Sequence, residues 1–401
     1  MAKILLLSHI FPPAIDGGSK VVYKLGQYFK KQDSQILYLS SDCSSTDDFN
    51  KTKTKTLKDQ KTKILKLPVY HRLRKPLKFI NLFLPQKTYL HQLLQIFQKG
   101  PIFKTIPFIK AIIQILKFKP DLIIAGPLPT TVILYANLLK FLSNKLNNYS
   151  TKLLINASFH PTDPDFHRSP LIKTLQLADY IWTLTQSEND YFIKNFKINP
   201  DKLILAGNGI DKSFLIKKPK SNIQHLTSNI LFIGSLSAHK GLDTLITSFS
   251  SLLTTKLIIA GQKTLYYPQI RKQIKKLPKN IKSKIKFIFS FPQNKLSQII
   301  DNCNVLVLPS KQESFGLVLL ESWARQKPVI VSDIPSLSEI VTKTNGGLIF
   351  KLDSSTDLSQ KISKILKNTK LAHQLSQNGF NYVKNNYTWE VVGNKIKEKI
   401  F

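Results

Sequence analysis

The chain has few cysteines and no long hydrophobic run, and each shortage excludes a class of protein. Cys43 and Cys303 are the only cysteines among 401 residues, and no Cys/His spacing suits zinc or a disulfide framework. A reducing, cytoplasmic location is therefore expected. No stretch approaches the ~18 to 20 consecutive apolar residues that span a bilayer. Residues 1–9 are too short in their apolar part to predict a signal peptide.

Acidic residues are also scarce, because 24 Asp and Glu face 59 Lys and Arg and leave a formal net charge of +35. Such a charge attracts nucleic acid, anionic lipid or phosphorylated ligands. Nucleic acid is the least expected of these partners, since the chain has no basic helix, RNP-like aromatic motif or zinc-finger spacing. A drift toward Lys, Ile and Asn codons explains the excess as well, so the charge alone does not decide.

Short aliphatic runs alternate with longer amphipathic stretches along the whole chain. With 401 residues and 42% hydrophobic composition, the chain can fill two domains of roughly 150 to 200 residues each. The alternation is typical of parallel sheets with crossover helices. The expected strands are 3–7, 35–39, 63–67, 121–125, 152–156, 180–184 and 202–205, followed by 229–233, 256–260, 284–289, 305–308 and 328–331.

A polar stretch with a proline and no clear period separates the two series of strands. We therefore predict a first domain at 1–213, a linker at 214–228, a second domain at 229–385 and a returning segment at 386–401. The expected fold class is α/β, with two doubly wound, Rossmann-like domains facing a central cleft. Ligands of such folds bind at the carboxyl ends of the strands.

The segment 71–117 differs from the rest because it mixes basic residues with bulky apolar ones. An interfacial helix has this composition when its cationic side meets anionic lipid and its apolar side enters the headgroup layer. The alternative is a set of helices that pack on the first sheet with lysines facing water. Packing is the favoured alternative for residues 105–117. Peripheral attachment to the inner face of the cell membrane therefore stays open beside a purely cytoplasmic location.

Two glutamates, Glu313 and Glu321, stand eight residues apart after a predicted strand. If a helix begins near Ser314 or Phe315, the free amides of residues 315–318 and the positive end of the helix dipole can hold a diphosphate. Eight residues at helical pitch separate the two carboxylates by about 12 Å. A diphosphate joins a hexose to a ribose on the same scale. The structural alternative is a helix-cap glutamate followed by a surface glutamate.

Gly17 and Gly18 follow the first predicted strand and open a helix. A turn without side chains lets backbone amides approach a ligand closely. The pattern is not GxGxxG, which disfavours a dinucleotide redox cofactor. A plain helix-opening turn is the alternative.

Together these residues resemble glycosyltransferase family 4, the retaining members of the group 1 glycosyl transferases with the GT-B fold. The resembling segments are Pro12-Pro13 to Gly17-Gly18, Asn208-Gly-Ile-Asp211, Gly234 to Lys240-Gly241, Glu313 to Glu321 and Trp389. The resemblance implies transfer of a hexose from a nucleotide-diphosphate sugar to a glycan or lipid-linked acceptor in cell-envelope or polysaccharide synthesis. Alternatives are a non-catalytic sugar-nucleotide or glycan-binding protein, an epimerase and a phosphorylase.

The resemblance also implies roles for single residues. Glu313 contacts the donor sugar, Glu321 the ribose and Lys240 the donor phosphates, while His160 lies over the reacting sugar. Lys240 suits this role physically, because an ammonium near a strand-to-helix turn is a counter-charge for a leaving diphosphate. The predicted catalytic residues are His160, Glu313 and Lys240. The predicted donor-binding residues are Gly17, Gly18, Gly234, Ser235, Lys240, Ser314, Phe315, Gly316, Leu317, Val318 and Glu321.

The segment Asp163-Pro-Asp165 imitates the D-x-D signature of metal-dependent glycosyltransferases with the other fold. Its place in a proline-rich loop predicts a turn, and we expect no essential metal ion and no cofactor. The expected partners are a nucleotide sugar, a glycan or lipid-linked acceptor and an anionic membrane surface.

The chain departs from the family pattern at several positions. Ser235 stands where an arginine usually follows the glycine of the phosphate loop, so one cation for the diphosphate is missing. Arg325 or Lys263 could replace it, and the sequence leaves both open. Gln326 stands where a glycine is common, and Pro335-Ser336 replace a usual glycine pair. The last residues, 387–401, resemble the terminal helix that crosses back to the first domain.

Overall fold

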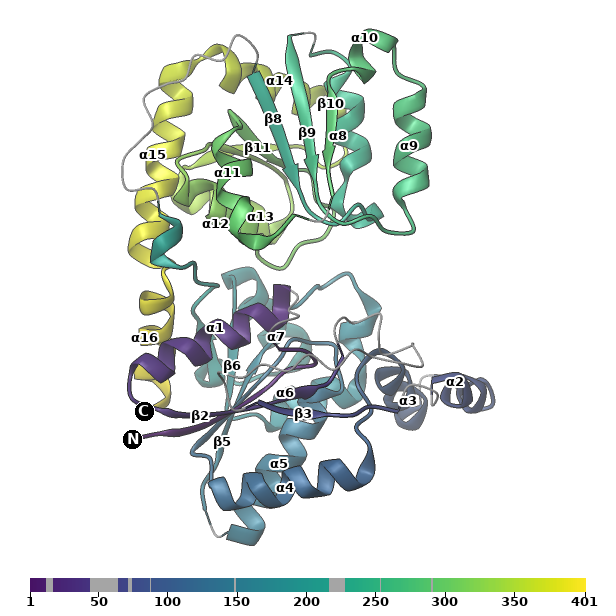
Figure 1. Cartoon of the computed structure of the whole chain (residues 1–401), viewed down its shortest axis with the longest axis vertical. Helices are drawn as coiled ribbons and strands as arrows, with labels where there is room; N and C mark the ends of the chain where they lie inside the picture. Colours follow the sequence, from purple (N-terminus) through teal and green to yellow (C-terminus); the bar gives the residue numbers. More distant parts are fainter. Residues whose placement is uncertain are drawn as a thin grey trace. The chain divides into compact units, whose positions relative to one another are not determined.

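The computed structural model describes residues 1–11, 17–43, 64–70, 74–86, 88–147, 149–215, 228–252, 254–289 and 291–401. The chain forms two compact units (Figure 1). Unit 1 consists of Met1–Gly207 and Val392–Phe401, and unit 2 consists of Asn208–Val391. The Pro12-Pro13 pair, residues 71–73 and most of the predicted linker lie outside the described residues.

Unit 1 contains a seven-stranded parallel sheet with the order β3-β2-β1-β4-β5-β6-β7. Central strands are buried on both faces, and all four residues of β4 are fully buried, which explains why these strands are continuous apolar runs. The strands are β1 Lys3–Leu7, β2 Gln35–Ser41, β3 Ile64–Leu67, β4 Leu122–Ala125, β5 Lys152–Asn156, β6 Tyr180–Thr183 and β7 Leu203–Leu205.

The helices of unit 1 cover both faces of this sheet, as expected when right-handed crossovers run in two directions from β1 (Figure 1). The first helix buries Val21, Val22 and Leu25 at helical spacing, and two lysines in its last turn favour its dipole. The helices are α1 Gly17–Lys31, α2 Arg74–Leu82, α3 Tyr89–Lys99, α4 Thr105–Phe118, α5 Val132–Asn147, α6 Ser169–Leu177 and α7 Gln186–Phe196, with 3₁₀ helices at Pro164–His167 and Pro200–Lys202.

Unit 2 contains a six-stranded parallel sheet with the order β10-β9-β8-β11-β12-β13. Its strands are β8 Ser228–Ile233, β9 Thr255–Ala260, β10 Ile285–Ile288, β11 Val305–Leu308, β12 Val329–Ser332 and β13 Gly347–Phe350. All twelve predicted strands are present with ends shifted by no more than two residues, and β13 is one that we did not predict. The expectation of two doubly wound α/β units is therefore confirmed.

The helices of unit 2 include one long pair near its end, formed by α14 and α15. Trp323 of α12 is fully buried against α15, where its ring lies next to Gly379, and it donates its indole N–H to the Gly346 carbonyl at 2.8 Å. The helices are α8 Leu242–Phe249, α9 Tyr267–Lys275, α10 Lys279–Lys282, α11 Leu296–Asp301, α12 Leu317–Ala324, α13 Pro335–Thr344, α14 Ser355–Lys367 and α15 Thr369–Asn386, with 3₁₀ helices at Lys212–Phe214, Ala238–Lys240 and Gln293–Lys295.

Each sheet reverses its strand order at one point. The reversal lies between β1 and β4 in unit 1 and between β8 and β11 in unit 2. At such a point the loops leaving two neighbouring strands diverge to opposite faces, which opens a crevice at the carboxyl ends of the strands. Gly17 and Gly18 follow β1, while Lys240 and Glu313 follow β8 and β11. The topology therefore brings most of the predicted residues to the two reversal points.

The chain links the two units twice, and the two links pair with each other. Ile210 donates its N–H to the Tyr387 carbonyl at 2.8 Å, and Trp389 donates its N–H to the Ile210 carbonyl at 3.1 Å. Gly209 lies so close to the Trp389 ring that a Cβ would overlap it. Helix α16 (Trp389–Ile400) starts at this pairing, and from Val392 onward it belongs to unit 1.

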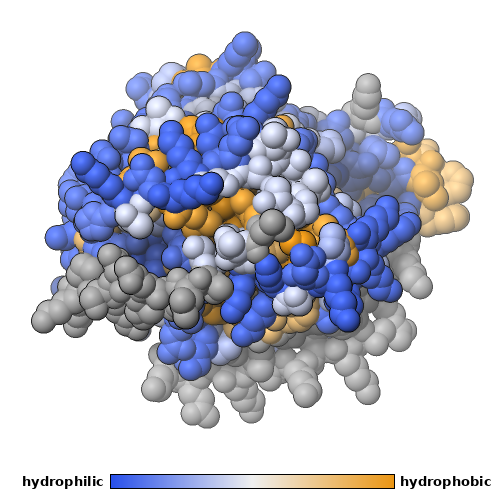
Figure 2. Space-filling view, turned by 90° about the horizontal axis from the view of Figure 1, so that it is seen from above, coloured by the Kyte–Doolittle hydropathy of each residue, from blue (hydrophilic) through white to orange (hydrophobic). Residues whose placement is uncertain are grey.

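The helices from the segment 71–117 divide into two kinds. Helix α4 buries Ala111 and Ile115, so it packs on the core of unit 1, as favoured for residues 105–117. Helices α2 and α3 expose bulky side chains, and Figure 2 shows hydrophobic atoms at the right-hand edge, where α2 lies in Figure 1. We call this the α2–α3 surface; it consists of Phe79, Ile80, Leu82, Phe83, Tyr89 and Leu90, each at least half exposed. No described helix is long and apolar enough to cross a membrane.

The substitution Gly379→Ala should destabilise unit 2. A Cβ at this position of α15 would overlap the buried Trp323 ring, which costs about 1 to 3 kcal/mol in a packed core. The gain in helix propensity from Gly to Ala is at most about 1 kcal/mol, so the overlap dominates. Calorimetry should show a lower Tm. Gly17→Ala is the matched control, because no atom lies within 4 Å of its Cβ position, and an equal Tm for both variants would contradict the packing argument.

Candidate functional site

Two loops of unit 2 meet at its reversal point. The first leaves β8 at Gly234 and ends in the 3₁₀ helix Ala238–Lys240, and the second leaves β11 at Pro309. Lys311 donates its N–H to the His239 carbonyl at 2.8 Å. Gly241 has φ 63°, and a Cβ there would overlap the Pro309 carbonyl oxygen. The backbone of one loop is therefore fixed against the other, and only glycine fits at position 241.

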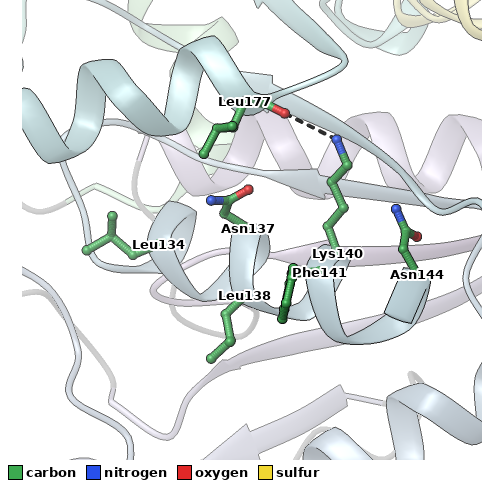
Figure 3. Close-up of a pocket in the computed structure, with 7 residues that line it drawn as sticks. All are labelled: Leu134, Asn137, Leu138, Lys140, Phe141, Asn144 and Leu177. Atoms are coloured by element: carbon green, nitrogen blue, oxygen red, sulfur yellow. Dashed lines mark hydrogen bonds between the residues drawn. The ribbon is translucent and has the colours of Figure 1, made fainter. Parts of the chain in front are cut away.

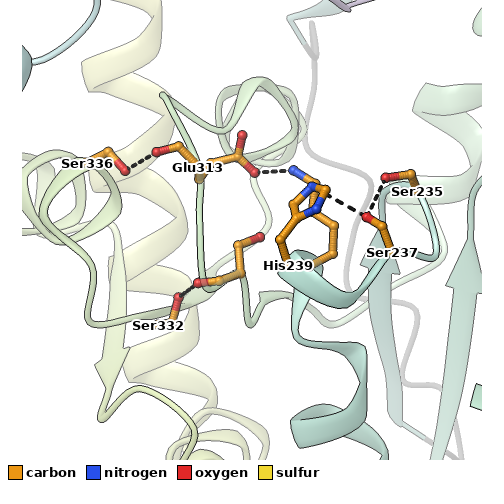
Figure 4. Close-up of polar contacts among 8 residues, drawn as sticks. Ser235, Ser237, His239, Glu313, Ser332 and Ser336 are labelled. Carbon is orange, nitrogen blue, oxygen red and sulfur yellow. Dashed lines mark hydrogen bonds and ion pairs between the residues drawn. The ribbon is translucent and has the colours of Figure 1, made fainter. Parts of the chain in front are cut away.

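An ion pair lies where these loops meet. The Lys240 ammonium is 2.6 Å from the Glu313 carboxylate, and the two side chains are 20% and 14% exposed. Figure 4 shows this contact at the labelled Glu313. The aliphatic part of the Lys240 side chain passes Gly234, since a Cβ on Gly234 would lie 3.9 Å from the Lys240 Cδ atom. The Lys240 ammonium and the Glu313 carboxylate thus lie side by side, partly shielded from water, where a polar ligand can contact both.

Two serines hold the backbone on which Glu313 stands. Ser336 donates its hydroxyl to the Glu313 carbonyl at 2.6 Å, and Ser332 donates to the Ser310 carbonyl at 2.5 Å (Figure 4). Ser336 is half of the Pro335-Ser336 pair that departs from the family pattern. Its hydroxyl makes a contact that a glycine could not make, so this departure supports the position of Glu313.

Helix α12 begins at Leu317, so the expected start near Ser314 or Phe315 is wrong. Gly316 caps the helix with φ 77°, a left-handed conformation that keeps the preceding residues out of the helix. Eight helical steps therefore do not separate Glu313 from Glu321, which lies in the second turn of α12. In the described part of the chain, the N–H groups of residues 315–318 donate no hydrogen bond. They remain available to an anion at the positive end of the helix.

The buried side chain of Phe315 holds the start of α12 in place. It is 1% exposed, and its ring lies 5.4 Å from that of Tyr387, whose pKa is raised by burial. Because Tyr387 also pairs with Ile210, the loop after β11 rests on the segment that links the two units. The Phe315 side chain is thus a packing group, so only the backbone of this residue is left for donor binding.

The loop after β8 carries hydroxyls where a guanidinium was expected. Ser235 and Ser237 lie 3.0 Å apart through their Oγ atoms, and the Nε2 atom of His239 is 3.4 Å from Ser237 (Figure 4). Arg325, one candidate to replace the missing cation, binds Asp301 with two nitrogens at 2.8 and 2.6 Å. Arg325 stands at the C-terminal end of α12 and also donates to the Phe214 carbonyl. Arg325 is therefore committed elsewhere.

Lys311 adds a second ionic contact next to Glu313. Its ammonium lies 2.9 Å from Asp353 and 3.5 Å from Asp243. The hydrogen bond to Asp353, followed by the charge of Asp243, raises the pKa of Lys311. The residue therefore stays charged and ties the loop after β11 to the start of α8. Sequence reasoning did not single out this contact, because its three members come from distant segments.

In unit 1 the predicted glycines lie at the reversal point between β1 and β4. A Cβ on Gly18 would overlap the Pro127 ring that follows β4, whereas Gly17 has open space around it. Ser19, in the same turn of α1, is buried and accepts a hydrogen bond from Ser8 at 2.8 Å. The close approach of α1 to the loop after β4 thus requires Gly18 and leaves the Gly17 backbone accessible.

His160 follows β5 in a loop that a buried carboxylate fixes. Glu188 is 6% exposed and accepts the N–H of Phe159 at 3.0 Å and that of Leu184 at 2.6 Å. Ser158 has φ 44°, a strained conformation that this anchoring helps to maintain. We did not predict Glu188. Thr185-x-x-Glu188, a capping-box pattern at the start of α7, is the signal that could have found it.

Asp163 and Asp165 form a turn, as predicted. Asp163 caps the 3₁₀ helix Pro164–His167 by accepting the Asp165 N–H at 2.9 Å, and Asp165 pairs with Arg168. Among the described residues, no group of three His, Cys, Asp or Glu side chains could hold a metal ion.

A pocket of about 490 Å³ lies on the helical layer of unit 1, away from the carboxyl ends of the strands (Figure 3). Lys140 crosses it, donates to the Leu177 carbonyl at 3.2 Å and pairs with Asp179 at 2.6 Å. None of the predicted site residues lines it. The lining residues are Leu134, Asn137, Leu138, Lys140, Phe141, Asn144 and Leu177.

Residues 190–382 match the family model described as Glycosyl transferases group 1. An uncharacterized glycosyltransferase of Methanocaldococcus jannaschii is 29% identical over 241 residues, which cover 55% of this chain and 65% of that protein. The O-antigen chain mannosyltransferase of Salmonella typhimurium is 27% identical over 202 residues, or 50% of this chain and 54% of that protein. The chain thus matches between about half and two thirds of the length of these curated relatives.

Solved structures match over nearly the full length. Sucrose-phosphate synthase from Thermosynechococcus elongatus has a TM-score of 0.73 at 17% identity and covers 99% of this chain and 98% of its own. The Anabaena protein HepE, solved with UDP and glucose, has a TM-score of 0.73 at 15% identity and covers 100% of this chain and 99% of its own. At such identities the likeness establishes the fold alone, and that fold is GT-B.

The substitution Glu188→Gln should loosen the loop that carries His160. One carboxylate oxygen becomes an NH₂ group that faces a backbone N–H, which leaves a buried donor unsatisfied at a cost of about 1 to 3 kcal/mol. We expect a lower Tm and faster hydrogen exchange at the Phe159 amide. Glu398→Gln, on the exposed side of α16, is the control. Unchanged exchange at Phe159 in the Glu188 variant would contradict the anchoring role.

Proposed function

Because the chain carries a glycosyl transferases group 1 domain on the GT-B fold, we propose that it transfers a hexose from a nucleotide-diphosphate sugar to a glycan or lipid-linked acceptor, with retention of anomeric configuration. The observation that carries this proposal is the Lys240–Glu313 pair beside the free amides of residues 315–318. A cation, a carboxylate and an anion-binding helix start converge at one reversal point. Such a set suits a ligand that combines a diphosphate with sugar hydroxyls.

The proposed chemistry needs charge stabilisation at the leaving diphosphate. The amides of residues 315–318 and the Lys240 ammonium would bind the negative charge that develops as the bond to the sugar breaks. The Glu313 carboxylate would accept hydrogen bonds from hydroxyls of the transferred ring, and Glu321 from those of the ribose. The acceptor hydroxyl then attacks the anomeric carbon from the face that the diphosphate leaves, and its proton passes to an oxygen of the departing diphosphate.

The relatives support the choice of substrates. HepE was solved in complex with UDP and glucose, and the Salmonella relative is an O-antigen chain mannosyltransferase. These proteins favour a nucleotide sugar as donor and a cell-envelope glycan as acceptor for this chain. For His160, which stands in the loop of unit 1 that Glu188 fixes, the resemblance implies a role at the reacting sugar. We further propose that no divalent ion is required, as the resemblance to the metal-independent class with the GT-B fold implies.

The proposal predicts transfer from one of a panel of radiolabelled UDP- and GDP-sugars to lipid extracts, undiminished by EDTA. The anomeric configuration of the product, measured by NMR, should equal that of the donor. Nucleotide binding without transfer or hydrolysis of any donor would instead favour a non-catalytic sugar-nucleotide-binding protein. The missing cation at Ser235 motivates this alternative. Loss of activity in EDTA would overturn metal independence.

The variants Glu313→Gln and Glu321→Gln separate the two proposed carboxylate roles in the same assay. Removing a charge that acts mainly in the transition state costs about 10²- to 10³-fold in kcat, so Glu313→Gln should lower kcat and spare the affinity for the free nucleotide. Glu321→Gln should weaken nucleotide binding. If both variants bind and turn over like the wild type, the assignment is wrong.

We also propose that the α2–α3 surface attaches the protein to anionic membranes. Phe79 and Phe83 are 63% and 74% exposed, and their rings lie 5.0 Å apart, so they form one aromatic group. Lys78 is exposed on the same helix. Aromatic side chains next to a lysine are typical of helices that enter the headgroup layer of a membrane whose lipids are negatively charged. A lipid-linked acceptor would lie in that layer.

The double variant Phe79→Ser/Phe83→Ser should bind vesicles of phosphatidylglycerol at least tenfold more weakly than the wild type, because two large apolar groups no longer leave water. Flotation measures the bound fraction. Leu265→Ser, which alters a 98% exposed side chain of unit 2, is the control. Equal binding to neutral phosphatidylcholine vesicles, or equal binding of the variant, would remove the proposal.

A further inference from the structure

Lys263 stands beside the loop that lacks the expected cation. Leu236 donates its N–H to the Gln262 carbonyl at 2.9 Å, and Leu236 and Lys263 form an isolated parallel bridge. One residue further back, Gly261 approaches Gly234 so closely that a Cβ would overlap the Gly234 carbonyl oxygen. The backbone of residues 261–263 is thus fixed to residues 234–236. The backbone of Lys263 therefore has a fixed position next to Ser235.

The Lys263 ammonium lies over two aromatic rings. Its ammonium is 4.4 Å from the centroid of the Phe289 ring and 5.1 Å from that of Tyr267. Phe287 stacks on Phe289 with ring centroids 5.2 Å apart, which helps to hold the Phe289 ring in place. Aromatic faces attract a cation without neutralising it. Within the described part of the chain, Lys263 forms no ion pair with a carboxylate, so its full charge is available to a ligand.

The charge balance of the site shows why this cation matters. Lys240 is paired with Glu313 at 2.6 Å, so the two together present almost no net charge. A nucleoside diphosphate carries at least two negative charges, and neutral amides alone do not balance them. The Arg325 guanidinium is already paired with the Asp301 carboxylate. Lys263 is the remaining candidate named by the sequence, and it is held next to the loop.

We infer that Lys263 supplies the second cation for the donor diphosphate, in place of the arginine that Ser235 lacks. The inference rests on the proposed function, since it names a further contact of the same donor site. The Lys263 side chain leaves the Phe289 and Tyr267 rings, and its ammonium forms a charge-assisted hydrogen bond to a phosphate oxygen. The role belongs to binding and charge stabilisation, and it concerns the phosphates rather than the base.

Calorimetric binding of UDP, GDP, uridine and guanosine to Lys263→Met tests this inference. We expect the Kd of the diphosphate that binds the wild type to rise about five- to tenfold, and to depend less on salt, because one phosphate contact is lost. Affinity for the matching nucleoside should not change. Lys272→Met, an exposed lysine of α9, removes the same charge from the same unit as a control. Lys263→Arg should retain binding.

A rescue experiment separates a phosphate contact from a general loss of charge. Ser235→Arg, introduced into Lys263→Met, should restore diphosphate affinity to within about twofold of the wild type, because the guanidinium returns to the loop. The inference is overturned if Lys263→Met binds the diphosphate like the wild type, if nucleoside affinity falls equally, or if Lys272→Met has the same effect. In those cases the proposed transferase stands. Failure of the wild type to bind either diphosphate overturns both.

Discussion

The contact between Lys240 and Glu313 is the interaction on which the candidate site depends. It joins the loop after β8 to the loop after β11, and it forms because these strands are neighbours at the reversal of the sheet. The backbone bond from Lys311 to His239 and the approach of Gly241 to Pro309 hold the same two loops together. The sheet order thus determines which side chains meet, and the loops determine how closely.

Much of the fold could be predicted from the sequence because buried parallel strands are continuous apolar runs between amphipathic stretches. Strand β13 was missed, since its four residues Gly347–Phe350 start with glycine and carry a single short aliphatic run. The start of α12 was placed too early because the sequence does not show that Gly316 takes a left-handed conformation. Local patterns predict which elements exist, and their ends depend on backbone geometry.

The site was predictable in its residue types and less so in its contacts. Glu313 and Lys240 were singled out separately, yet they are 73 residues apart, and only the sheet order brings them within an ion-pair distance. The sequence left Arg325 and Lys263 as equal substitutes for one cation. Asp301 occupies the first, whereas aromatic rings hold the second. Such choices depend on neighbours from other segments, which no spacing encodes.

The return of the C-terminal helix to unit 1 has a consequence for the order of folding. Unit 1 is built mainly from the first half of the chain, yet Tyr28 bonds to Asn394, and Lys152 donates to the Ile400 carbonyl at 2.6 Å. On the ribosome these partners emerge only after all of unit 2 has been synthesised. Unit 2 contains only contiguous residues and can complete its core first. The unit that begins the chain is therefore the last to be finished, and its contacts are the least local of the molecule.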